Sequence, residues 1–151
     1  MSIFKNLAEI KSSEGKFLGT TAGRIITQKM IDDFANATLD FQWIHVDAER
    51  AKQTPVGSTI AHGFLTLSLA AKFLEELLNI ASVKMGINYG LNKVRFINVV
   101  PVNARLQMSA TIKSVEDFAD NGAKIMIDAV IHIEGQTKPA CVLEWIVVQF
   151  E

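Results

Sequence analysis

A carboxylate and an imidazole stand five positions apart in the segment DFQWIH, at Asp40 and His45. If both side chains reach the same water molecule, the pair can perform general acid–base chemistry. The carboxylate would polarise the water, and the imidazole would orient it or carry its proton. The spacing is equally compatible with Asp40 ending a helix and with His45 as a hydrogen-bonded loop residue. Both interpretations stay open on spacing alone.

A second candidate group is the dipeptide His62-Gly63, which directly precedes an apolar stretch. The first N–H groups of a helix have no acceptor within the helix, and the helix dipole favours negative charge there. Glycine also lets a ligand approach the backbone closely. The N–H of Gly63 would therefore suit a thioester oxygen that becomes an enolate. The alternative is a packing or capping role for Gly63 and a polar cap at His62.

A third segment, INYGLNKVR at residues 87–95, is polar and partly basic. Lys93 and Arg95 could receive the phosphates of a carrier such as coenzyme A. Basic side chains on an exposed strand face are more often only solvated. The candidate substrate- or carrier-binding residues are Gln42, His62, Asn88, Tyr89, Asn92, Lys93 and Arg95.

Signatures of other chemistries are missing or unspecific. His132 shares the polar face of a predicted strand with Asp128 and Glu134, but such spacing does not define a metal site, so we expect a surface group. Cys141 lies in the apolar segment ACVLEWIVV and is expected in the core rather than as a nucleophile. The sequence contains no glycine-rich phosphate loop, nucleophile elbow, zinc signature or Rossmann fingerprint.

The composition of the 151 residues, 49% of them hydrophobic, is typical of one domain with its own core. A formal net charge of -1 argues against a nucleic-acid partner. The single cysteine allows no intrachain disulfide and fits a reducing compartment. The N-terminal residues lack signal-peptide features, and charged residues interrupt the most apolar stretch, residues 60–78. We expect a cytoplasmic protein that does not contact the membrane.

The elements in the first half of the chain must position the candidate groups. Residues 17–26 are predicted to form a strand, after which Thr27 caps a short helix. Residues 40–46 show no regular period and are predicted as a loop, and Asp47 can cap a single helical turn. A longer helix begins near Gly63. This helix is apolar on nearly all sides, which predicts burial on most of them.

The second half changes to strand periodicity. The predicted strands are residues 87–90, 93–97, 105–113, 124–134 and 138–150. Asn121-Gly122 is a strong turn signal between two of them. Helices and strands are segregated along the chain, which predicts an α+β fold. One long apolar helix beside about five strands favours an antiparallel β-sheet wrapped around that helix.

Two motifs in order resemble the MaoC-like dehydratase family, within it the NodN-like, (R)-specific enoyl-CoA hydratase branch. The run ATLDFQWIHVDAERA contains the family's Asp, a His five positions later, then an acidic residue and an alanine. Here these are Asp40, His45, Asp47 and Ala51. The second motif, TPVGSTIAHGFLTLSL, pairs Ala-His-Gly with an apolar helix. With INYGLNKVRF and KPACV, the resemblance covers roughly residues 25–145.

The chain departs from the family pattern next to the proposed catalytic residues. Many members have glycine before the aspartate, where Leu39 stands here. The Asn-Pro pair common in the wider family is replaced by Gln42-Trp43. These changes keep the Asp40–His45 pair. They mean that the family pattern does not predict the reaction rate or the substrate range of this chain.

The resemblance implies a single hot-dog domain over residues 1–151, usually as a homodimer with active sites at or near the subunit interface. It implies a hydro-lyase of fatty acid metabolism. In such an enzyme Asp40 and His45 hold one water for syn addition to a trans-2-enoyl-CoA, giving a (3R)-hydroxyacyl-CoA. Gly63 would supply an oxyanion N–H. No metal or redox cofactor is implied, because coenzyme A arrives as part of the substrate.

Two other activities remain as alternatives. A hot-dog acyl-CoA thioesterase would direct water at the thioester carbonyl instead of the double bond. A non-catalytic acyl-binding module would bind the ligand without turnover. The spacing of Asp40 and His45 favours the hydratase, since it matches that branch's signature.

Overall fold

Six strands form the main β-sheet of the computed structural model, which describes residues 1–151. Their bounds are Phe17–Thr20 (β2), Arg24–Ile25 (β3), Met85–Phe96 (β5), Arg105–Phe118 (β6), Gly122–Ile133 (β7) and Pro139–Phe150 (β8). They pair antiparallel in the order β2-β6-β7-β8-β5, with β3 also beside β6. Two further short strands, Ser2–Phe4 (β1) and Leu78–Ile80 (β4), pair in parallel. The predicted antiparallel sheet is confirmed.

Two predicted strands have different bounds in the structure. The segment predicted as residues 17–26 is divided into β2 and β3, because Gly23 adopts a φ of +92° and the Thr21 hydroxyl takes the place of a strand acceptor by bonding the Met108 N–H at 2.9 Å. The two short strands predicted at 87–90 and 93–97 are one strand, β5. Two register shifts against β8 interrupt the alternation of side chains along β5, so the sequence pattern indicates two separate strands.

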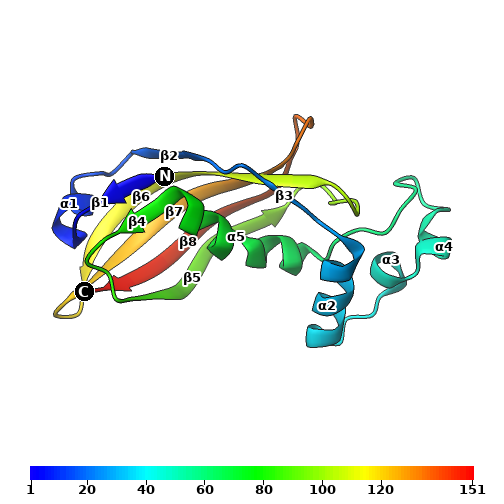
Figure 1. Cartoon of the computed structure of the whole chain (residues 1–151), viewed down its shortest axis with the longest axis horizontal. Helices are drawn as coiled ribbons and strands as arrows, with labels where there is room; N and C mark the ends of the chain where they lie inside the picture. Colours follow the sequence, from blue (N-terminus) through cyan, green and yellow to red (C-terminus); the bar gives the residue numbers. More distant parts are fainter.

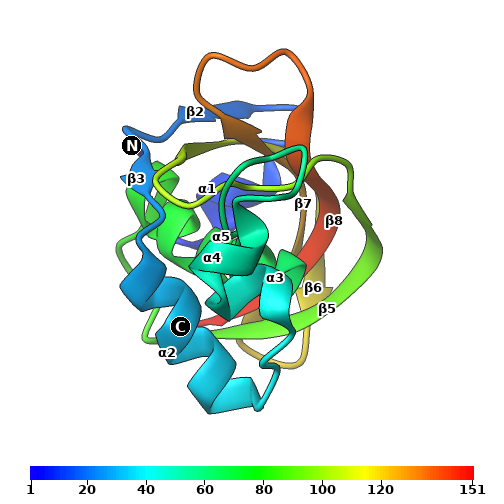
Figure 2. The same cartoon turned by 90° about the vertical axis from the view of Figure 1, so that its right-hand side faces the viewer.

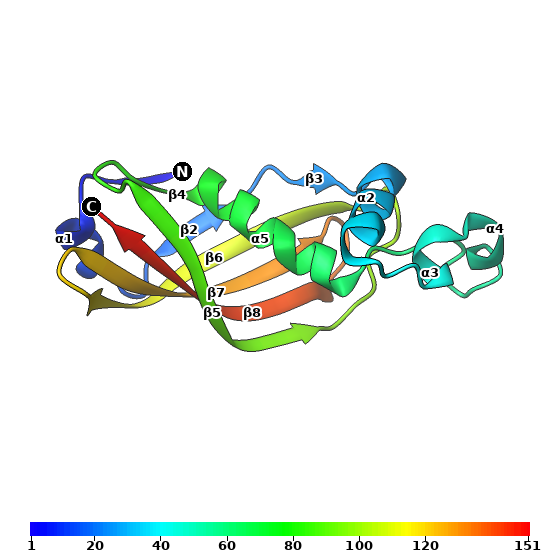
Figure 3. The same cartoon turned by 90° about the horizontal axis from the view of Figure 1, so that it is seen from below.

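The helix α5 (Gly63–Leu77) lies against the curved sheet, as Figures 1 and 3 show. Phe73, Leu74 and Leu77 on its inner face join a continuous core with the buried residues of β6, β7 and β8. This helix inside a curved antiparallel sheet is the hot-dog arrangement expected from the sequence. Burial on most sides of its first three turns is confirmed, since only one stripe of Phe64, Ser68 and Lys72 is exposed there.

Three small helices project beyond one end of the sheet (Figures 1 and 3) and face the viewer in Figure 2. They are Gln28–Thr38 (α2), Trp43–Val46 (α3) and Ala48–Ala51 (α4), and a further short helix, Leu7–Lys11 (α1), lies near the opposite end. The predicted caps are confirmed: Thr27 accepts a hydrogen bond from the Met30 N–H at 3.2 Å, and Asp47 accepts one from the Arg50 N–H at 3.0 Å. The loop predicted at residues 40–46 was wrong for its second part, which is α3. A single helical turn is too short to show a periodic pattern.

The remaining predictions on side chains concern Cys141 and His132. Cys141 is fully buried in the core, and this burial raises the pKa of its thiol to about 11. His132 is half-buried on the outer face of the sheet, where its Nε2 lies 3.2 Å from the Ser109 hydroxyl. None of the helices combines the length and the apolar character that crossing a bilayer requires.

Candidate active site

His45 lies in α3 and is only 6% exposed. Its Nδ1 is 2.7 Å from the carbonyl oxygen of Ile60. Because a carbonyl only accepts hydrogen bonds, Nδ1 carries the hydrogen and Nε2 keeps a free lone pair in the neutral ring. Burial lowers the pKa of His45, outweighing the opposing effects of the Ile60 hydrogen bond and of Asp40. The lowered pKa favours the neutral ring, in which Nε2 is available to accept a hydrogen bond.

The backbone around His45 is held by residues that the sequence did not single out. Gln28, the first residue of α2, donates its side-chain N–H to the carbonyl of His45 at 2.8 Å and accepts a hydrogen bond from the Thr59 hydroxyl. The Ile60 N–H donates to the carbonyl of Ile44 at 3.1 Å. These bonds join α2, α3 and the segment before α5. No sequence pattern marks Gln28, since a glutamine in the first turn of a helix is usually solvated.

Asp40 directly follows the end of α2. Leu39 ends that helix with left-handed backbone angles, φ 61° and ψ 23°, so the chain turns sharply at this point. The Asp40 side chain is exposed and accepts a hydrogen bond from the Gln42 N–H at 3.3 Å. Asp40, His45 and His62 each offer one ligand atom within 4.8 Å of the others. One water can bridge two groups at this separation, since two hydrogen bonds together span up to roughly 5.6 Å.

His62 is buried next to His45 and is 3% exposed. Its ring stacks on the ring of His45, with centroids 3.8 Å apart and planes 23° apart. Its Nε2 is 3.0 Å from the backbone carbonyl of Asp40, whereas its buried Nδ1 has no hydrogen-bond partner. The sequence predicted a substrate- or carrier-binding role, but the structure surrounds this side chain with other protein groups.

The Asp40, His45 and His62 side chains include the ligand types of a metal site, but their orientation does not suit one. An imidazole lone pair lies in the plane of its ring, and a metal ion binds about 2.0–2.1 Å from the nitrogen along that direction. Two nearly parallel rings stacked 3.8 Å apart cannot both direct a lone pair at one ion. The arrangement is better suited to proton transfer through a water molecule.

A pocket of about 310 Å³ connects His45 with the start of α5. Its lining includes His45, Gly63, Thr66, Phe96 and Asn98. Gly63 is the first residue of α5, where the N–H has no intrahelical acceptor, and the His62 side chain does not cap the helix. The Gly63 N–H is therefore without an intrahelical partner in a helix start that lines the same pocket as His45.

Gly63 also has the packing role that the sequence left open. A Cβ at this position would lie 3.1 Å from the ring of Phe96, so the glycine allows that ring to cover the start of α5. Phe96 and Thr66 were not predicted as site residues. Thr66 follows Gly63 by three positions, which places both on one face of the helix, and its polarity within an apolar helix was a usable signal. Phe96 carried no such signal.

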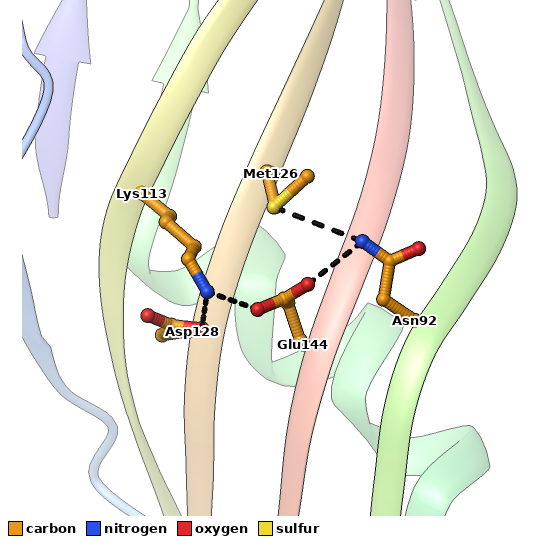
Figure 4. A network of polar contacts seen from close by, with 5 residues as sticks. All are labelled: Asn92, Lys113, Met126, Asp128 and Glu144. Carbon is orange, nitrogen blue, oxygen red and sulfur yellow. Dashed lines mark hydrogen bonds and ion pairs between the residues drawn. The ribbon is translucent and has the colours of Figure 1, made fainter.

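The predicted carrier-binding residues on β5 do not line this pocket. Asn88 and Tyr89 line a separate pocket between α5 and β5. Asn92 lies in a polar network on the sheet surface (Figure 4), where it donates to Glu144 at 2.7 Å. Lys113 and Asn92 hold the pKa of Glu144 below its usual value.

The other two residues on this strand are Lys93 and Arg95. Lys93 lies opposite Glu144 in the antiparallel register of β5 and β8. The Arg95 side chain donates a hydrogen bond to the backbone carbonyl of Val94 at 2.8 Å. Gln42 is exposed at the start of α3. Contact of Gln42 and of the β5 side chains with substrate or carrier stays a prediction.

Comparisons with known proteins agree with the fold and the motifs. Residues 9–134 match the family described as MaoC like domain. The 3-hydroxyacyl-thioester dehydratase Z of Mycobacterium tuberculosis is 42% identical over 97% of this chain and 97% of its own length. Nodulation protein N of Rhizobium leguminosarum bv. viciae is 38% identical over 97% of this chain and 92% of its own length.

Solved structures support the same fold at lower identity. An R-hydratase from Pseudomonas aeruginosa is similar with a TM-score of 0.73 over 97% of this chain and 86% of that chain, at 20% identity. A protein of Archaeoglobus described as a monoamine oxidase regulatory protein reaches 0.76 over 99% of this chain and 97% of that one, at 23% identity. Since the family match spans most of the chain and the relatives align along nearly their whole length, this chain belongs to the MaoC-like dehydratase family.

Proposed function

We propose that this chain is an (R)-specific enoyl-CoA hydratase, which adds water to a trans-2-enoyl-CoA and forms a (3R)-hydroxyacyl-CoA. The coarser activity, a hydro-lyase reaction between a 2-enoyl and a 3-hydroxyacyl thioester, is that of the family and of the dehydratase that is 42% identical. The observation that carries the proposal is that His45, with Nδ1 bonded to Ile60, has a ligand atom within 4.8 Å of one of Asp40 and lines one pocket with Gly63.

In the proposed mechanism Asp40 and His45 hold one water molecule above C3 of the substrate. The water oxygen bonds to C3 while one of its protons passes to Nε2 of His45. The electron pair of the double bond moves to the thioester oxygen, where the Gly63 N–H stabilises the enolate. The carbonyl then re-forms as C2 takes the proton back from the imidazolium. Addition is syn because one residue pair delivers the hydroxyl group to C3 and the proton to C2 from the same face.

The test is incubation of the purified protein with crotonyl-CoA. Hydration removes the ultraviolet absorbance of the conjugated enoyl thioester without releasing free thiol. Thiol release would instead identify a thioesterase, and saturable binding without turnover would identify an acyl-binding module. Either of these two results refutes the proposed function.

Variants of the pair test the assigned roles. Asp40→Asn and His45→Gln are each expected to lower kcat by about 10²-fold or more, since each removes one proton-handling group. Asp33→Asn and His132→Gln are matched controls outside the site and should keep the wild-type rate. Full activity of both site variants would exclude this mechanism.

Chiral analysis of the product tests the (3R) assignment. The carrier is tested by comparing kcat/KM for crotonyl-CoA with that for the same acyl group on acyl carrier protein. A clear preference for the protein-bound substrate would replace coenzyme A as the carrier while leaving the hydration chemistry in place.

We also propose that the chain works as a homodimer formed along β5. This strand ends the order of the main sheet, so one of its edges is unpaired, and none of its residues is buried in the single chain. Tyr89 is 57% exposed on it, and Phe64 is exposed on the neighbouring side of α5. A long edge strand that exposes large side chains such as Ile87 and Leu91 is prone to aggregate unless another chain covers it. A second copy of this chain would cover the strand edge and the exposed side of the helix together.

Analytical ultracentrifugation tests this arrangement. The wild type is expected to sediment as a dimer, and Leu91→Lys should shift the equilibrium toward monomer by placing a charge on the strand. Phe17→Lys, on the exposed strand β2 at the opposite edge, is the matched control and should leave the dimer unchanged. A monomeric wild type, or dissociation by the control alone, would contradict the proposed interface.

A further inference from the structure

His62 contacts both Asp40 and His45 and precedes Gly63, but it does not line the pocket. Its ring lies between two others, with centroids 3.8 Å from His45 and 5.0 Å from Phe34. Its Nε2 lies 3.0 Å from the carbonyl oxygen of Asp40. In the chain it directly precedes Gly63. One side chain thus joins α2, the turn at Asp40, α3 and the start of α5.

We propose that His62 is a positioning residue, whose Nε2–H bond to the Asp40 carbonyl sets the place of the Asp40 carboxylate relative to His45 and Gly63. This inference rests on the proposed hydratase function. The carbonyl of Asp40 can only accept, so the hydrogen is on Nε2 of His62. The stack between Phe34 and His45 fixes the plane of the ring and therefore the direction of that N–H.

Asp40 needs such support because its own surroundings hold it weakly. Its side chain is exposed, and it makes one long hydrogen bond of 3.3 Å, to the Gln42 N–H. Leu39 before it adopts backbone angles that non-glycine residues disfavour. The bond from the buried His62 is thus the hydrogen bond that ties the Asp40 backbone to the start of α5. Displacing a catalytic group by about 1 Å can cost a factor of about 10² in rate.

The unpartnered Nδ1 of His62 supports a role beyond packing. A buried polar atom without a hydrogen-bond partner is unfavourable, so an apolar ring of the same shape would serve the core at least as well. A histidine at this position is therefore best explained by the hydrogen bond of its other ring nitrogen, Nε2. That nitrogen donates to Asp40.

Two substitutions separate the hydrogen bond from the stack. His62→Phe keeps a flat ring between Phe34 and His45 but removes the donor. His62→Gln loses the stack but keeps an amide N–H near the position of Nε2. We expect H62F to lower kcat for crotonyl-CoA hydration by about 10- to 100-fold with KM changed less than about threefold, since ground-state binding is untouched. H62Q should recover at least several-fold of the lost kcat, and H132F, the same change on the outer face of the sheet, should match wild type.

Each outcome decides between roles. Wild-type kcat in H62F, or an H62Q no faster than H62F, overturns the proposal. A raised KM at unchanged kcat would instead assign His62 to direct substrate binding. Circular dichroism and thermal unfolding establish that the variants fold, and His62→Leu replaces H62F if the ring is not tolerated. Loss of fold in both donor-free variants would show a structural role and also overturn the proposal. A wild type without hydratase activity would reject the proposed function itself, before any variant is compared.

Discussion

Replacing Leu39 with glycine should stabilise this protein. Leu39 ends α2 with φ 61° and ψ 23° and is 78% exposed. The left-handed conformation costs a non-glycine residue about 1–2 kcal/mol, because the Cβ crowds the following carbonyl. Glycine avoids that cost but loses about 0.5–1 kcal/mol through the greater freedom of the unfolded chain. With the middle of each range, the net gain is about 0.5–1 kcal/mol, since the exposed leucine side chain gives up little burial.

For a chain of this length, such a gain corresponds to a rise in Tm of about 1–4 °C. The measurement is thermal unfolding by calorimetry at one fixed protein concentration, because self-association makes Tm depend on concentration. Thr38→Gly is the matched control. Thr38 is the last residue of α2 and donates its hydroxyl to the Phe34 carbonyl at 2.8 Å, so glycine there should lower stability by about 1 kcal/mol.

A fall in Tm for Leu39→Gly would refute this reasoning. It would show that the leucine side chain makes a stabilising contact that outweighs its backbone strain. The same variant should keep the wild-type hydration rate, because glycine adopts these backbone angles without strain and leaves Asp40 in place.

Three further outcomes follow from buried groups. Because burial lowers the pKa of His45 below its ordinary 6.5, the acid-side midpoint of kcat/KM for hydration should lie below pH 6.5; a midpoint at or above pH 6.5 would contradict a neutral His45 base. Phe73→Ala should reduce the free energy of unfolding by about 3–5 kcal/mol in a urea titration, since the ring is fully buried in the core, and a loss below about 1 kcal/mol would be inconsistent with that packing. Cys141, with its pKa raised to about 11, should react with a thiol reagent at pH 8 far more slowly in the folded protein than in denaturant; equal rates would place it at the surface.

Local patterns in the sequence were sufficient for most of the fold. Alternation predicted β6 and β7, because every second residue from Leu106 to Ile112 and from Ile125 to Ile133 faces the core. Thr27 and Asp47 were found as caps because capping depends on residues two or three positions away. The β5 strand was predicted as two pieces because its register shifts depend on where β8 pairs with it, which is not a local property.

The sequence alone identified Asp40, His45 and Gly63 as candidate site residues. It could do so because the type of a residue and its spacing from its neighbours limit the chemistry that the residue can perform. The tertiary structure decided how they are held. The hydrogen-bonded nitrogen of His45 is set by the carbonyl of Ile60, fifteen positions away, and the contact between His62 and Asp40 spans twenty-two. Such contacts form only when α2, α3 and the start of α5 meet at one end of the sheet. No pattern along the chain records them, because they depend on where the backbone runs in space rather than on which residues are neighbours in sequence.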